Sequence, residues 1–212
     1  CGHACEHNAP KVNDACSACG TAMLARVDYT AFDGAKSEGY TDLQKAINAA
    51  QSASIRNSNV VLTLLRDHEV GMSRPTVRSG TFTIDLNAHT LSREKGDVLA
   101  LRSPAVVTIR NGSIREIANG SAVSVVDGAT AYIESGNYGT LYGSFHYNTV
   151  KLSGGQFDCI CWGRQIWLKI LAADHRFVYT ESGEPITLKD LQGKMVMYGV
   201  SVESCPHGYG TE

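Results

Sequence analysis

Two pairs of potential metal ligands near the start of the chain have the spacing of a metal-binding knuckle. Cys5-x-His7 is followed after eight residues by Cys16-x-x-Cys19, and Gly20 comes directly after. Thiolates and imidazoles are ligands that Zn²⁺ prefers, and a structural zinc ion takes four of them in a tetrahedron. The glycine allows the tight backbone turn that such a knuckle needs. The pattern therefore predicts a structural Zn²⁺ with these two cysteine-containing pairs as its ligands.

The cysteines also have other uses that the sequence leaves open. The chain holds seven cysteines, an odd number, so a scheme of intramolecular disulfides leaves one over. Paired disulfides or reactive thiols are the alternatives to zinc. Cys1-x-His3 could compete for the metal, and Cys205-x-His207 repeats half of the motif at the other end. We interpret the chain, which opens on a cysteine without Met, as a piece of a longer protein with further modules.

Three carboxylates, those of Asp127, Glu134 and Asp158, are the candidates for hydrolytic chemistry. Glycoside hydrolysis needs two carboxyl groups about 5–10 Å apart in a groove, and these three qualify only by their place in the sequence. Clustered acids could also bind Ca²⁺, an ion that prefers about six to eight oxygen ligands. The sequence assigns no catalytic residue.

Aromatic residues crowd the stretch from 138 to 167. Aromatic faces with polar tips suit the recognition of sugars or proteins. The alternative is that these rings pack between the last strands and a C-terminal cap. The candidate ligand-binding residues are Tyr138, Tyr142, Tyr147, Trp162 and Trp167.

Cys159 and Cys161 share one face of a predicted strand. Free cysteines are often buried as small apolar residues, so both are expected to point into the core. A second metal site is the alternative.

The positions of all these side chains depend on an internal repeat. Four segments, 81–87, 106–112, 130–136 and 149–155, align without gaps, and their central apolar residues are 25, 24 and 19 residues apart. Each segment alternates apolar and polar residues, which predicts a half-buried strand. Aligned apolar faces at this period predict stacked turns of a parallel β-helix, with a flat or sandwich arrangement as the alternative. The central residues are Ile84, Ile109, Ile133 and Leu152.

Further strands complete this pattern. A second strand in each turn is expected at 98–101, 122–125 and 159–161, and residues 60–65 would form the first turn. The outward row of the repeat reads Asp85, Arg110, Glu134 and Ser153. Adjacent rungs lie about 5 Å apart, so the opposite charges are expected to form a salt ladder and not a calcium cage.

A short helix precedes the repeat. Thr41 and Gln44 have the spacing of a capping box, and an apolar stripe runs from Leu43 to Ala50. We expect this helix to cap the N-terminal end of the stacked turns and hide their open edge. The predicted organisation is a zinc knuckle over 1–20, a connector with one possible strand over 21–40, the capping helix and β-helix over 41–163, a C-terminal cap over 164–204, and the start of a following knuckle or linker over 205–212.

Composition excludes two classes of partner. The formal charge is −2, and lysine and arginine are scattered, whereas a nucleic-acid binder usually has a basic patch. Nucleic acid is therefore not an expected partner, which argues against a zinc-ribbon nucleic-acid binder. No apolar run approaches the roughly 18 residues of a membrane helix, so membrane insertion is not expected either.

Several of these motifs together resemble a known family. The knuckle is followed by Leu43-x-x-Ala46-x-x-x-Ala50, then by a Val-Leu-Thr-Leu-Leu-Arg-Asp strand at 61–67 and an Ile-Asp-Leu-Asn segment at 84–87. In this order they are similar to the pectate-lyase-like β-helix repeats of large secreted or wall-attached proteins of Gram-positive bacteria. The closing stretch from Leu171 to Cys-x-His is similar to the end of those repeats.

The resemblance implies an all-β fold: a right-handed parallel β-helix (solenoid) with an N-terminal capping helix and a small N-terminal zinc knuckle. It implies a secreted or cell wall-attached location. The fold hosts lyases, hydrolases and non-catalytic adhesins alike, so it does not fix the activity. We expect a non-catalytic module that acts in adhesion to, or recognition of, host protein or glycan. The alternative is a carbohydrate-active enzyme of the β-helix type, either a polysaccharide lyase or a glycoside hydrolase.

Overall fold

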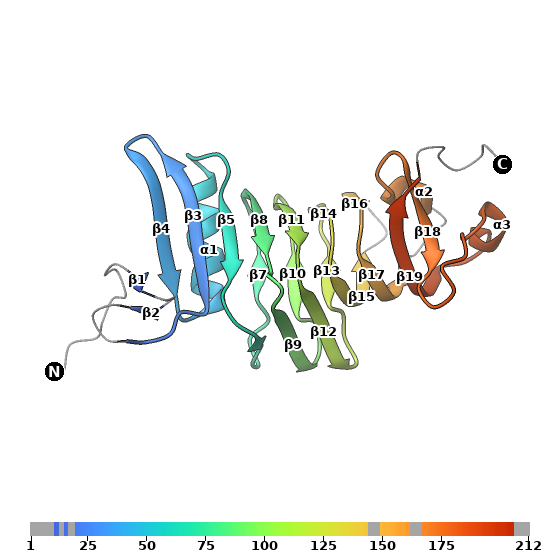
Figure 1. Ribbon diagram of the computed structural model, residues 1–212, viewed down its shortest axis with the longest axis horizontal. Coiled ribbons are helices and arrows are strands. Elements are labelled where there is room, and N and C mark those ends of the chain that lie inside the picture. The colour runs from blue at the N-terminus through green and yellow to red at the C-terminus, as the bar shows by residue number, and fades with distance from the viewer. Residues whose placement is uncertain (1–10, 13–14, 17–19, 144–148, 162–166, 206–212) are drawn as a thin grey trace.

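The structure, a computed structural model, is a parallel β-solenoid of about four turns, seen in Figure 1 as a row of short strands along the long axis. It describes the backbone of residues 11–12 and 15–16, and residues 20–143, 149–161 and 167–205 in full. The predicted all-β solenoid is confirmed, and the sandwich alternative is wrong. The right-handed winding remains a prediction. Within the described ranges, no helix is long and apolar enough to cross a membrane.

The first sheet carries the predicted repeat. Its order is β16–β14–β11–β8–β5–β3–β4, and its strands from β5 to β16 run parallel. Alternating side chains put one face of each strand in the interior. These strands are β3 (Ala25–Ala31), β4 (Gly34–Tyr40), β5 (Val61–Leu64), β8 (Thr81–Asp85), β11 (Val106–Arg110), β14 (Thr130–Ile133) and β16 (Thr149–Leu152).

The second sheet forms the remaining wall of the solenoid. Its order is β18–β19–β17–β15–β12–β9–β6, and a branch of β7, β10 and β13 joins it at β15. The additional strand expected in each turn is confirmed at β10, β13 and the end of β17. These strands are β6 (His68–Glu69), β7 (Thr76–Val77), β9 (Thr90–Lys95), β10 (Leu99–Leu101), β12 (Ser113–Ala118), β13 (Val123–Val125), β15 (Asn137–Gly143), β17 (Gln156–Cys161), β18 (His175–Tyr179) and β19 (Val196–Ser204).

The predicted column of apolar residues runs through the interior. Ile84 pairs with Ile109, Ile109 with Ile133, and Ile133 with Leu152, all in register between neighbouring parallel strands. None of the four is more than 4 % exposed. Stacking buries the apolar face that a single turn would leave in water, and this burial is the main driving force for the fold.

The shorter spacing of the last turns has a structural cause at β15. In the preceding turn, β12 and β13 are separate strands joined by residues 119–122. In contrast, β15 runs without a break from its pairing with β12 to its pairing with β13. The pairing offset falls from 24 residues, between Ile114 and Tyr138, to 18, between Val123 and Leu141. The protruding corner of the earlier turns is therefore missing from β15 onward, and the surface has a step there.

Helix α1 (Leu43–Ser54) lies against the first turn (Figure 1). Its buried residues form the stripe that the sequence predicts: Leu43, Ala46, Ile47 and Ala50. The predicted capping box is wrong, because the N-cap is Asp42, whose side chain accepts a hydrogen bond from Lys45 N. Gln44 instead pairs with the backbone of Thr76 in β7.

An antiparallel hairpin lies at each end of the stacked turns. The predicted connector contains β3 and β4, and β3 pairs antiparallel with β5. At the other end β19 pairs antiparallel with β17, and β18 with β19. Two short helices complete the C-terminal region, α2 (Trp167–Ile170) and α3 (Leu188–Leu191).

A small hairpin precedes the solenoid. Its strands β1 (Lys11–Val12) and β2 (Ala15–Cys16) pair antiparallel, with Lys11 opposite Cys16. The other predicted zinc ligands, Cys5, His7 and Cys19, lie outside the described residues, as do the half-motif residues Cys1, His3 and His207.

Candidate functional site

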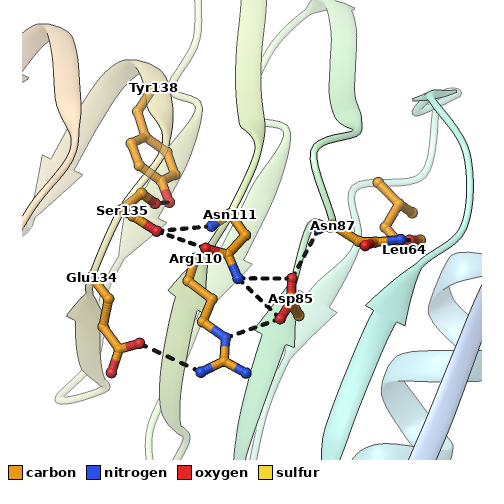
Figure 2. A network of polar contacts seen from close by, with 8 residues as sticks. All are labelled: Leu64, Asp85, Asn87, Arg110, Asn111, Glu134, Ser135 and Tyr138. Atoms are coloured by element: carbon orange, nitrogen blue, oxygen red, sulfur yellow. Dashed lines mark hydrogen bonds and ion pairs between the residues drawn. The ribbon is translucent and has the colours of Figure 1, made fainter.

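The outward row of the first sheet forms the predicted salt ladder (Figure 2). Arg110 Nε lies 3.0 Å from Asp85 Oδ2, and Arg110 Nη1 lies 3.8 Å from Glu134 Oε2. One arginine on the middle strand thus neutralises a carboxylate on each neighbouring rung. Ser153, the fourth member of the row, donates to the backbone oxygen of Ile133 and takes no part in the ladder.

A second polar layer supports this ladder at the corner where the chain leaves the first sheet. Asp85 accepts hydrogen bonds from Asn87 N at 2.9 Å and from Asn111 Nδ2 at 3.2 Å. Asn111 N in turn donates to Ser135 Oγ at 3.1 Å (Figure 2). Both asparagines have positive φ angles, a conformation that asparagine tolerates better than most residues. These hydrogen bonds hold the turn in shape and pair the polar atoms with one another.

The candidate hydrolytic carboxylates lie apart and have arginine partners. Asp127 Oδ2 is 2.7 Å from Arg102 Nη1, and Asp158 Oδ2 is 3.3 Å from Arg115 Nη1. Glu134 belongs to the ladder. Among the residues that the structure describes, no three His, Cys, Asp or Glu side chains gather as metal ligands. Each of the three candidate carboxylates therefore has an arginine partner.

Two of the candidate aromatic residues are in the wall of the solenoid. Tyr138 is 1 % exposed, its ring stacks on Phe157 with centroids 5.3 Å apart, and its hydroxyl donates to Ser135 O. Burial raises the pKa of the Tyr138 hydroxyl above its ordinary value. Tyr142 is half-buried on β15. Tyr138 is thus a core residue. Tyr147 and Trp162 lie outside the described residues.

Trp167, the last candidate, borders a hollow at the C-terminal end. Trp167 is 3 % exposed, and its indole Nε1–H donates to Lys194 O at 3.0 Å. The hollow has a volume of about 630 Å³, within the usual range of ligand pockets. We name it the α2–α3 groove, and its lining residues are Trp167, Leu168, Lys169, Leu188, Lys189, Leu191 and Gln192.

Local hydrogen bonds hold the two short helices that form the groove. Thr187 caps α3: its hydroxyl accepts from Asp190 N, and Asp190 Oδ2 accepts from Thr187 N. The Thr187 hydroxyl also donates to Asp190 Oδ2, and this bond, together with the one from Thr187 N, lowers the pKa of the Asp190 carboxyl. On the other wall, Lys151 Nζ donates to Lys169 O at 2.7 Å and to Leu171 O at 3.3 Å, which joins the end of α2 to β16.

The groove exposes apolar side chains beside lysines. Leu168 is 46 % exposed and Leu188 is 50 % exposed, one on each helix. The side chains of Lys169 and Lys189 belong to the lining, and both are exposed. An apolar hollow with a cationic rim has the general character of a binding site. Sequence reasoning found Trp167 but missed the leucines, because each helix has only four residues and shows no periodic pattern.

The prediction that Cys159 and Cys161 face the core is wrong. Both are half-buried, whereas the intervening Ile160 is buried. The strict alternation that starts at the buried Phe157 fails because β17 follows β15 where that strand passes from its pairing with β12 to its pairing with β13, so Asp158 and Cys159 both lie between two inward residues. Burial, followed by the nearby Cys161 and Glu116, raises the pKa of the Cys159 thiol to about 11.

Comparison of the chain with protein-family models, curated proteins and solved structures found no match. Function is therefore inferred from the side chains described above.

Proposed function

We propose that this chain is a non-catalytic recognition module of a secreted or wall-attached bacterial protein, and that it binds host protein or glycan at the α2–α3 groove. The observation that carries the proposal is the pair of half-exposed leucines that face a hollow of about 630 Å³. Exposed apolar side chains around a concave surface commonly mark an interaction site. The bacterial and extracellular setting rests on the resemblance in sequence alone.

The second candidate function is a carbohydrate-active enzyme of the lyase or hydrolase type. Arginine pairing of Asp127, Glu134 and Asp158 disfavours it, since a general acid or base must be able to exchange its proton with the substrate. Assay of the chain against a polysaccharide panel, with and without Ca²⁺, separates the two functions. Turnover that disappears in Asp127→Asn, Glu134→Gln or Asp158→Asn would establish the enzyme instead.

We also propose a structural Zn²⁺ at the N-terminal knuckle. The hairpin of β1 and β2 supports this proposal, because antiparallel pairing puts Lys11 opposite Cys16 at one end of the hairpin. The Cys5-x-His7 pair precedes that end and Cys19 follows it. Metal analysis should find about one zinc per chain, and Cys16→Ser with Cys19→Ser should abolish it. A zinc content near zero in the reduced, undamaged chain would contradict the site.

The recognition function is tested by screening the chain against immobilised glycans and extracellular host proteins. The variant Leu168→Ser with Leu188→Ser should lose binding, because it replaces the apolar walls by hydroxyls. Ile117→Ser is the matched control, since Ile117 is 71 % exposed on β12, away from the groove. Absence of any ligand, or a ligand that binds the double variant as well as the parent chain, would overturn the proposed function.

A further inference from the structure

The charges around the α2–α3 groove are unbalanced. Lys169 and Lys189 line it, and the backbone of Lys194 bonds to the Trp167 ring. All three lysines are exposed, and among the described residues no carboxylate lies within ion-pair distance of their ammonium groups. Asp190 carries the one carboxylate of α3. After its hydrogen bonds to Thr187, the charges of Lys194 and Lys189 also lower its pKa, so Asp190 offsets part of the positive charge. The rim is therefore net positive on a chain whose formal charge is −2.

This rim contrasts with the lateral faces of the solenoid. There several arginines pair with carboxylates, such as Arg74 with Asp97 and Arg102 with Asp127. A cluster of three lysines that one carboxylate only partly offsets, beside apolar walls, is complementary to a ligand that combines carboxylates with apolar side chains. Complementary charge of this kind selects partners and speeds their association.

We propose that the α2–α3 groove binds an acidic peptide segment of a partner protein, with leucine or phenylalanine side chains seated between Leu168 and Leu188 and carboxylates facing Lys169 and Lys189. This inference rests on the proposed recognition function and names its partner class. An amphipathic segment that lays apolar anchors in a groove is a recurrent mode of peptide recognition.

The ring of Trp167 favours a peptide over a glycan in this groove. Sugar recognition by stacking requires an exposed aromatic face, and Trp167 is 3 % exposed with its N–H already bonded. No other aromatic residue belongs to the described lining, which consists of leucines, lysines and one glutamine. Leucine walls provide non-directional apolar contact, and the exposed leucines match peptide side chains better than sugar hydroxyls.

The test measures binding of three fluorescein-labelled peptides of about twelve residues by fluorescence anisotropy. Their compositions are Leu/Glu, Leu/Lys and Ser/Glu, so that charge and apolarity vary separately. The Leu/Glu peptide should bind best, and its Kd should rise with salt, because exposed charges are screened within about 10 Å at 0.1 M ionic strength. Weaker binding of the other two peptides, each by roughly tenfold or more, is expected from the loss of one kind of contact.

Two variants and two controls locate the site. Leu168→Ser should weaken binding of the Leu/Glu peptide. Lys169→Glu with Lys189→Glu should weaken binding of the Leu/Glu peptide and strengthen binding of the Leu/Lys peptide. Lys95→Glu and Ile117→Ser, exposed changes on β9 and β12, should leave both peptides unaffected. Far-ultraviolet circular dichroism and the melting temperature check that each variant is folded, and Leu188→Ser replaces Leu168→Ser if the latter unfolds.

Several outcomes would overturn the inference. They are equal binding of the Leu/Lys or Ser/Glu peptide, no binding of any peptide at millimolar concentration, and indifference of the Leu/Glu peptide to the groove variants. Self-association that Leu168→Ser abolishes would assign the groove to a second copy. If a glycan from the screen binds the parent chain but not the double leucine variant, the recognition function stands and the peptide proposal is rejected. Failure of the inference is thus distinguishable from failure of the function.

Discussion

Asp85 is the most heavily bonded carboxylate of the described ladder. It accepts from Arg110, Asn87 and Asn111, and its side chain is 17 % exposed. Asp85→Ala leaves these donors without an acceptor, so we expect it to lower the free energy of unfolding by about 1–3 kcal/mol. Glu134→Ala is the matched control, because that carboxylate is 47 % exposed and 3.8 Å from its partner; it should cost less than about 0.5 kcal/mol. Urea unfolding measures both, and equal losses would contradict the network.

Glu116 bridges the step where β15 leaves β12. Its Oε1 accepts from Thr140 N at 2.8 Å, and its Oε2 is buried without a hydrogen-bond partner in the described structure. The carboxylate fits here because residue 139 is a glycine: a Cβ on Gly139 would lie 2.1 Å from Glu116 Oε2.

The acceptor at Glu116 should matter more than its charge. We therefore expect the free energy of unfolding of Glu116→Gln to lie within about 0.5 kcal/mol of that of the parent chain, or above it, because glutamine retains an acceptor for Thr140 N. Glu116→Ala should lose about 1–3 kcal/mol, because Thr140 N then has no acceptor. Chemical unfolding measures the stability of both variants. A glutamine variant as unstable as the alanine variant would show that the charge itself stabilises the step.

Cys159 should be an unreactive thiol. Its pKa is raised to about 11, and the thiolate is the reactive form. At pH 8 the thiolate fraction should be roughly a hundredfold below that of an ordinary cysteine, and alkylation by iodoacetamide correspondingly slow. Peptide mass spectrometry measures the rate, with the same residue in urea as its own reference. Equal rates in the folded and unfolded chain would contradict the shift.

At the scale of elements, α1 satisfies the open edge of β7 with side-chain amides. Gln44 Oε1 accepts from Thr76 N at 2.8 Å, and Gln44 Nε2 donates to Thr76 O at 3.1 Å. Gln44→Ala should therefore cost about 1–3 kcal/mol of stability, because Thr76 is buried and its backbone would lose both partners. Lys45→Ala, on the exposed side of the same helix, should change it by less than about 0.5 kcal/mol. Similar melting temperatures for the two variants would rule out this role.

The repeat was predictable because its information is local. Period-two alternation centred on Ile84, Ile109 and Ile133 places the strands and their register without any knowledge of distant contacts. Strands β9 and β12 were missed because each has a single inward anchor, Leu91 or Ile114, followed by charged residues. The terminal hairpins were missed because their antiparallel pairing depends on which strand edge of the parallel stack is open. A single sequence gives no direct signal for this.

The candidate site was only partly predictable for the same reason. Trp167 was identified by residue type, but its role depends on how α3 packs beside α2, about twenty residues further along the chain. The predicted orientation of Cys159 was wrong because the alternation on which it relied fails in β17, which pairs with the unbroken strand β15. Pairing between adjacent rungs made the salt ladder predictable, because it needs only the register of the repeat.

At the scale of the whole molecule, the two ends differ in chemistry. Figure 1 shows the β1–β2 hairpin at one end of the row of turns and α2 and α3 at the other. The lateral faces in between carry ion pairs of adjacent rungs, such as Arg110 with Asp85. Under the proposed function, recognition takes place at one end of the rod, and the turns act as a spacer. An enzyme of the β-helix type would instead use the flat lateral face.

Hydrogen–deuterium exchange with a bound ligand tests this claim most directly. The ligand is the tightest binder from the panel of glycans and extracellular proteins, at saturating concentration. Recognition at the α2–α3 groove predicts slower exchange in residues 167–171 and 187–194, with little change in β8, β11 and β14. Protection along those three strands, with the groove unchanged, would contradict the account and move the binding site to the lateral face.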